Sequence, residues 1–94
     1  MNKEMEKIFK EWDEFDEKRR PDIVSSVFRM QMVLKRIGVL DSEKFIPNHK
    51  LNSMAIDDLR YIEVRACDAL YDNAEKKGAD IWAFETLNEL MEFF

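Results

Sequence analysis

The stretch PDIVSSVFRMQMVLKRIG, residues 21–38, decides the fold of this chain. Its apolar residues recur at helical intervals and cover a wide arc, so the segment predicts the most buried helix of the protein. Pro21 suits the first turn of a helix, and Gly38 suits a left-handed C-terminal cap, which bounds the helix to about 21–37. The residues expected to face inward are Ile23, Val24, Val27, Phe28, Met30, Val33, Leu34 and Ile37.

Two more long helices are expected on either side of this segment. The first covers about residues 2–18 and is amphipathic, with an apolar stripe made of Met1, Met5, Ile8, Phe9, Trp12 and Phe15. The other is the longest helix, which begins after an N-cap at Asn52 or Ser53 and ends at Gly78. Its inward stripe is predicted to be Leu59, Ile62, Ala66, Ala69, Leu70 and Ala74.

A last helix is expected over residues 81–94. Asp80 is its predicted N-cap, and the apolar residues that recur at the helical interval are Ile81, Phe84, Leu87, Met91 and Phe94. No segment alternates like a β-strand. The sequence therefore predicts one all-α domain of residues 1–94, a small antiparallel bundle of about four helices. One long loop separates the second helix from the third, with a short helical turn at 42–45, and the short linkers at 19–21 and 78–80 make the joined helices antiparallel neighbours.

The charge of the chain is acidic and unevenly distributed. Fifteen basic and 20 acidic side chains give a net charge of −5, which disfavours attraction of the whole molecule to nucleic acid or an anionic membrane. Residues 1–17 carry a net −4, residues 18–50 a net +5 and residues 51–94 a net −6. The charged N-terminal segment, the short apolar runs and the single cysteine lead us to expect a cytoplasmic protein.

The sequence lacks the residue sets of common catalytic and metal sites. His49 is the sole histidine and falls in a predicted loop, while Cys67 is the sole cysteine and falls inside a helix. A nucleophilic triad and a zinc site both need more such residues close together. Glu-x-x-His pairs and glycine-rich phosphate loops do not occur either. We therefore expect no enzymatic activity, no metal and no cofactor.

Protein–protein interaction is the function that the last segment favours. Trp82, Leu90 and Phe93 lie off the inward stripe of the predicted last helix, and the sequence ends in two phenylalanines, which leaves apolar surface for a partner. Glu85, Glu89 and Glu92 follow at i, i+4 and i+7 on the predicted helix. Their carboxylates would repel each other and the negative C-terminal end of the helix dipole, which suggests a basic partner. The predicted partner-binding residues are Trp82, Glu85, Glu89, Leu90, Glu92, Phe93 and Phe94.

The predicted partner is another protein or a second copy of the chain, as in a homodimer. Small, acidic, cysteine-poor domains are typical of accessory proteins and of inhibitors, encoded by phages or mobile elements, that act on a host protein. This narrower hypothesis is an association by size and charge alone.

Two alternatives remain open. A nucleic-acid-binding protein would use the basic second helix, although the net charge and the apolar residues between the bases oppose this interpretation. Its phosphate contacts, or those of another anion, would come from Lys18, Arg19, Arg20, Arg29, Lys35 and Arg36. An oligomeric protein that sequesters a small anionic ligand would instead place arginines and Tyr61 or Tyr71 around that ligand.

Overall fold

The computed structural model describes residues 3–94, and helices occupy 78% of them. No β-strand occurs in this range, so the all-α prediction is confirmed. Met1, which the sequence places on the first apolar stripe, lies outside the described residues, as does residue 2, where the first helix is expected to begin. The elements in chain order are α1 (Lys3–Lys18), α2 (Arg20–Arg36), the 3-10 turn η1 (Ser42–Lys44), α3 (Asn48–Ser53), α4 (Ile56–Lys76), the 3-10 turn η2 (Ile81–Ala83) and α5 (Leu87–Glu92).

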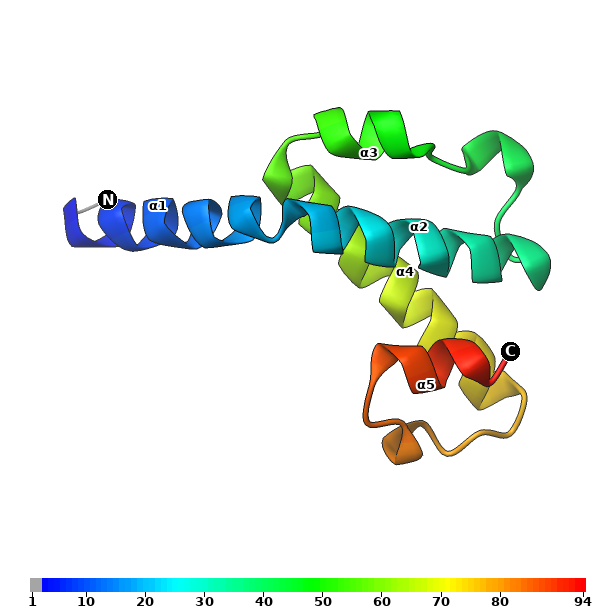
Figure 1. Ribbon diagram of the computed structural model, residues 1–94. Helices are drawn as coiled ribbons and strands as arrows, with labels where there is room; N and C mark the ends of the chain where they lie inside the picture. The colour runs from blue at the N-terminus through cyan, green and yellow to red at the C-terminus, as the bar shows by residue number, and fades with distance from the viewer. Residues whose placement is uncertain (1–2) are drawn as a thin grey trace.

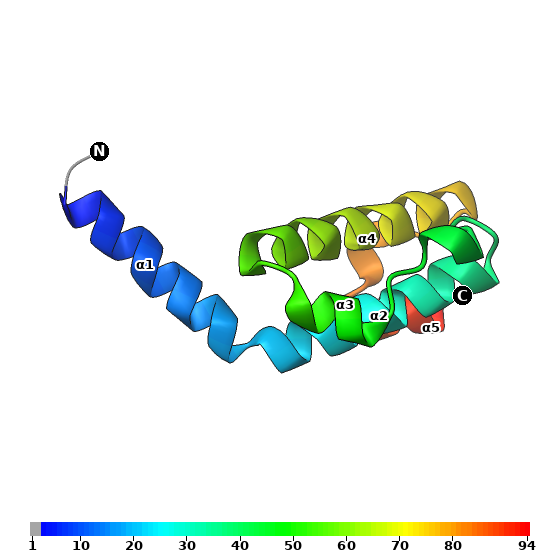
Figure 2. The same ribbon diagram turned by 90° about the horizontal axis from the view of Figure 1, so that it is seen from above.

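The core lies between α2 and α4, and α3 and α5 cover its sides (Figure 1). α2 contributes the most buried residues, as its sequence predicts, and α4 faces it with Leu59, Ala66, Leu70 and Ala74. α2 and α4 run in the same general direction, because the chain returns through α3 between them (Figures 1 and 2). The fully buried large side chains are Ile23, Val27, Met30, Leu51, Leu59, Leu70 and Leu90.

Both long core helices end at the predicted glycines. Gly38 has φ +83° and Gly78 has φ +87°, a left-handed conformation that costs a glycine little. After α2, the amide of Val39 donates to the carbonyl of Leu34 at 2.9 Å. After α4, the amide of Ala79 donates to the carbonyl of Ala74 at 3.0 Å. Both helices therefore end in a Schellman motif, which satisfies carbonyls of the last turn.

The connection between α2 and α4 is more ordered than a loop. The predicted turn at 42–45 is present as η1, but α3 was not predicted, because six residues give too little periodicity. The buried Gln31 side chain holds this connection: its Nε2 donates to the Ile46 carbonyl at 3.0 Å, and its Oε1 accepts from the Ile46 amide at 2.9 Å. The N-cap predicted at Asn52 or Ser53 is wrong. Ala55 is the N-cap of α4, and the Ser53 hydroxyl donates to the Lys50 carbonyl.

α1 does not fold back on α2, so the antiparallel packing expected for this pair is wrong. Arg19 alone separates the two helices, and α1 extends away from the bundle (Figures 1 and 2). The radius of gyration is 15.3 Å, whereas a compact domain of this length has about 13 Å. The projecting α1 explains this excess.

The helix predicted over residues 81–94 is also wrong in its first half. Asp80 caps only η2, where its carboxylate accepts the Trp82 amide at 3.1 Å. The backbone is extended at Phe84, and α5 begins after Thr86, whose hydroxyl accepts the Glu89 amide at 3.2 Å. A β-branched hydroxyl residue with extended backbone is a preferred N-cap, so Thr86 restarts the helix six residues later than predicted.

In the described part of the chain, no helix combines the length and the apolarity that crossing a bilayer requires.

Candidate functional site

Five of the eleven exposed large hydrophobic residues in the described part of the chain lie on α1. None of the 16 residues of α1 is buried. We call its apolar residues the α1 stripe; they are exposed by 38–61%, and they are Met5, Ile8, Phe9, Trp12 and Phe15. Phe9 and Trp12 pack edge to face, with ring centroids 5.7 Å apart. Such a face can bury itself only on another surface, and contiguous exposed apolar patches mark interaction sites.

A polar clamp at its C-terminal end holds α1 in this orientation. The Arg20 guanidinium pairs with both carboxylate oxygens of Glu17, at 2.7 and 2.8 Å, in the bidentate geometry of a strong ion pair. The same group donates to the carbonyls of Asn52 at 3.1 Å and Met54 at 2.8 Å, at the C-terminal end of α3. Asp16 lies 3.7 Å from the Arg60 guanidinium on α4. These contacts tie the end of α1 to the bundle and leave the rest of the helix projecting.

The ion pair perturbs the titration of both partners. The hydrogen bond from Arg20, with a smaller contribution from its charge, holds the pKa of Glu17 below its ordinary value. The hydrogen bond to Glu17 likewise raises the pKa of Arg20. The Glu17 carboxylate and the Arg20 guanidinium are therefore both charged at neutral pH.

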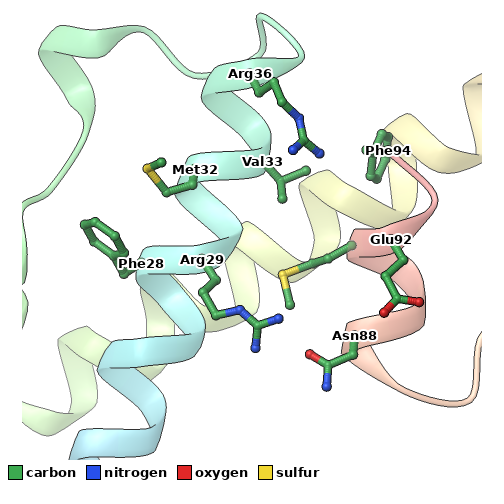
Figure 3. A pocket seen from close by; sticks show the side chains of 9 residues that line it. Phe28, Arg29, Met32, Val33, Arg36, Asn88, Glu92 and Phe94 are labelled. Atoms are coloured by element: carbon green, nitrogen blue, oxygen red, sulfur yellow. The ribbon is translucent and has the colours of Figure 1, made fainter.

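An open cavity of about 520 Å³ lies between α2 and α5 (Figure 3). Val33 and Met91 are among its apolar lining residues. Arg29 and Arg36 project from α2 into the gap toward α5 (Figure 3). The complete lining is Phe28, Arg29, Met32, Val33, Arg36, Asn88, Met91, Glu92 and Phe94. Apolar walls with two arginines at the rim could receive an apolar group that carries a negative charge.

The residues predicted to bind a partner do not all lie on the surface. Trp82 lies in η2 and is 90% exposed, the value expected of a contact residue. Leu90, in contrast, is fully buried in the core, so its assignment to a partner surface is wrong. The error follows from the late start of α5, which gives Leu90 and Met91 the inward positions of a shorter helix.

The predicted acidic stripe is also wrong as a helical feature. Glu85 precedes α5, and its amide donates to the Glu89 carboxylate at 2.8 Å. Glu89 stands in the first turn, where a negative charge favours the helix dipole. Only Glu92 stands at the C-terminal end of α5, and it lines the cavity. Local structure thus accounts for the position of Glu89 without a basic partner.

The two terminal phenylalanines pack in part on the chain itself. Phe93 is 41% exposed and meets Phe84 edge to face at 5.7 Å. Phe94 is partly buried against the core, with the Lys77 ammonium 5.2 Å from its ring centroid. Exposed apolar surface at the end of the described chain is therefore smaller than the sequence suggests.

The basic residues of the nucleic-acid hypothesis are spread from the end of α1 along the whole length of α2. Arg20 is committed to the clamp, and Arg19 lies over the Phe15 ring. Arg29 and Arg36 share the cavity, whereas the Lys35 ammonium lies 5.7 Å from the Phe45 ring centroid. At about 1.5 Å per residue, Arg20 and Arg36 are roughly 24 Å apart along the helix. Lys18 is exposed at the end of α1. The structure therefore brings together Arg29 and Arg36 but not the whole set.

The other candidate residues are dispersed. Tyr61 and Tyr71 are ten residues apart on α4, about 15 Å along its axis, so they do not share a site within one chain. Cys67 is partly buried; burial raises the pKa of its thiol, and the charges of Asp68 and Glu63 add to this shift. Within residues 3–94, no three His, Cys, Asp or Glu side chains gather in a way that could hold a metal ion.

Comparison with known proteins gives no family model that matches the chain, no similar curated protein and no similar solved structure.

Proposed function

We propose that this protein is a non-enzymatic protein–protein interaction module that binds through the α1 stripe. The single observation that carries the proposal is that α1 has five large apolar side chains on one face and no buried residue. The last segment, which the sequence favours for this role, contributes Leu90 to the core and keeps Trp82 as its strongly exposed aromatic residue.

The energetics of an exposed helix support an interaction role. Isolated helices of about 12–15 residues are marginal in water, and most helical stability comes from packing an amphipathic face. α1 has 16 residues, and away from the α1 stripe its sequence places opposite charges at i, i+4, as with Glu6 and Lys10. Pairs of this kind contribute only about 0.2–0.5 kcal/mol each. Burial of the α1 stripe on a partner is the larger stabilising term available to this helix.

The composition of the α1 stripe is also that of a binding surface. Trp12 and Phe15 are each 61% exposed, and aromatic anchors contribute a large share of the free energy in protein interfaces. Both project from the part of α1 nearest the clamp, where Arg20 contacts Glu17 and Arg60 contacts Asp16. An anchor held in place before binding loses less conformational entropy on association.

Affinity capture tests this function with matched tryptophan variants. The tagged wild type, Trp12→Ala and Trp82→Ala would each be incubated with lysate of the source cell, with and without nuclease treatment, and bound proteins would be identified by mass spectrometry. We expect a defined protein, or untagged copies of the chain itself, that is retained by Trp82→Ala and lost from Trp12→Ala.

Two results would contradict the proposal. Loss of the bound protein from Trp82→Ala alone would move the binding surface to the last segment. Binding that disappears after nuclease treatment and requires Arg29 and Arg36 would favour the nucleic-acid hypothesis instead.

A further inference from the structure

We propose that the occupant of the α1 stripe is the α1 stripe of a second copy, packed antiparallel in a homodimer. This inference rests on the proposed function, because it names the partner of the same surface.

The α1 stripe has the spacing of a coiled coil. Met5, Ile8, Trp12 and Phe15 are separated by three, four and three residues, which is the alternation of positions a and d in a heptad. Met5 and Trp12 then occupy a, and Ile8 and Phe15 occupy d. Phe9 falls at the adjacent position e and widens the apolar face. α1 therefore presents a seam of the kind that pairs with another helix.

The sizes of these residues favour an antiparallel pair. When the two helices run in opposite directions and cross near residue 10, Met5 meets Phe15 of the second copy, and Ile8 meets Trp12 of the second copy. Each layer then combines one aromatic and one aliphatic side chain. In a parallel pair, Trp12 would meet Trp12 and Phe15 would meet Phe15, and such layers of unequal size pack less evenly along the seam.

The flanking charges favour the same direction. Glu4, Glu11 and Lys18 occupy position g, and Asp16 occupies position e. In a parallel pair, position g of one helix lies beside position e of the other, so Glu11 would face Asp16 twice. In an antiparallel pair, g lies beside g. Glu4 then faces Lys18 twice, and Glu11 is the one charged residue at position g that faces its own copy.

The apolar area is sufficient for a small stable interface. Aromatic side chains bury about 150–250 Å² each. With three aromatic and two aliphatic residues exposed by 38–61%, the α1 stripe offers roughly 400–600 Å² of apolar surface per chain. Two copies would bury about 1,000 Å² together, the lower limit for a specific interface. The projection of α1 also keeps the two bundles at opposite ends of the helix pair (Figure 2).

Sedimentation velocity with charge-exchanged variants tests the dimer and its direction together. The wild type should dimerise as its concentration increases, and Trp12→Ala should weaken dimerisation by at least about tenfold. Glu4→Lys and Lys18→Glu should each weaken it several-fold at low salt, and the double variant should return to within about twofold of the wild type. Glu6→Lys, at the outward position b, is the matched control and should have little effect. Far-ultraviolet circular dichroism would verify that each variant keeps its helices.

Thiol crosslinking gives a second readout of direction. In a Cys67→Ser background, Glu11→Cys should crosslink to its own copy with a short bis-maleimide, whereas Glu14→Cys at position c should not. A dimer that crosslinks at neither position, or one in which the double charge exchange fails to restore association, would overturn the antiparallel arrangement.

A monomer at every concentration would overturn the homodimer altogether. The proposed function would survive that result if capture of a different protein still depends on Trp12. Both would fail if no bound species depends on Trp12.

Discussion

Replacing Leu90 with alanine should destabilise the protein strongly, whereas replacing Trp82 with alanine should change stability little. Leu90 is fully buried, and leucine-to-alanine changes in a core cost about 2–5 kcal/mol, according to how far the surroundings collapse into the space. α5 has six residues and can shift, so we expect the lower part of this range, about 2–3 kcal/mol. Trp82 is 90% exposed and should contribute less than about 0.5 kcal/mol to folding.

The assay is urea unfolding followed by far-ultraviolet circular dichroism, with all chains at one concentration because association also stabilises the folded state. A chain of 94 residues has a total stability of roughly 5–14 kcal/mol. The loss at Leu90 is therefore a large fraction and should lower Tm by about 8 °C or more. A Leu90→Ala variant that loses less than about 1 kcal/mol, or a Trp82→Ala variant that loses more than Leu90→Ala, would refute the placement of α5 in the core.

Four further predictions concern the clamp, the long connection and the thiol. Arg20→Ala should cost about 1–2 kcal/mol and speed hydrogen exchange around Glu17, since the arginine joins three segments. The pKa of Glu17 is lower in the folded protein than in the unfolded chain. The stabilisation from its ion pair is therefore complete above the ordinary glutamate pKa of about 4.3 and should be lost as the pH falls through the pKa of the folded protein. Hydrogen exchange around Glu17 at pH 7 and pH 3 measures this loss. Gln31→Leu should cost at least about 2 kcal/mol in urea unfolding, because the Ile46 amide and carbonyl lose their partner, whereas the exposed neighbour change Met32→Leu should be neutral. Cys67 should react with iodoacetamide at pH 7 more slowly than a cysteine in a short peptide, since its raised pKa lowers the thiolate fraction; a rate equal to the peptide would contradict this.

The two core helices could be predicted because their sequences act locally. The apolar period of residues 23–37 continues without interruption, and Gly38 and Gly78 supply the left-handed conformation that ends each helix. α1 has an equally regular period, but periodicity does not say which surface a stripe will bury. Its direction depends on Arg20, whose guanidinium reaches carbonyls 32 and 34 residues away in the sequence.

The last segment was mispredicted because two signals conflict. Ile81, Phe84, Leu87 and Met91 have helical spacing, but the Thr86-x-x-Glu89 pattern is a capping-box sequence that starts a new helix. The Thr86 hydroxyl accepts the Glu89 amide, as this pattern predicts. That cap shortens the helix, places Leu90 in its second turn and removes the acidic stripe.

Tryptophan fluorescence at increasing protein concentration tests the role of the α1 stripe most directly. A Trp82→Phe variant reports on Trp12 alone, and a Trp12→Phe variant reports on Trp82 alone, since the chain has two tryptophans. We expect Trp12 emission to be that of a hydrated indole in dilute solution and to shift to shorter wavelength as the chains associate, while Trp82 emission remains unchanged. Trp12 emission that stays at the long wavelength of a hydrated indole at every concentration, or that is already at short wavelength in the monomer, would contradict the conclusion that α1 is an interaction surface filled by a second copy.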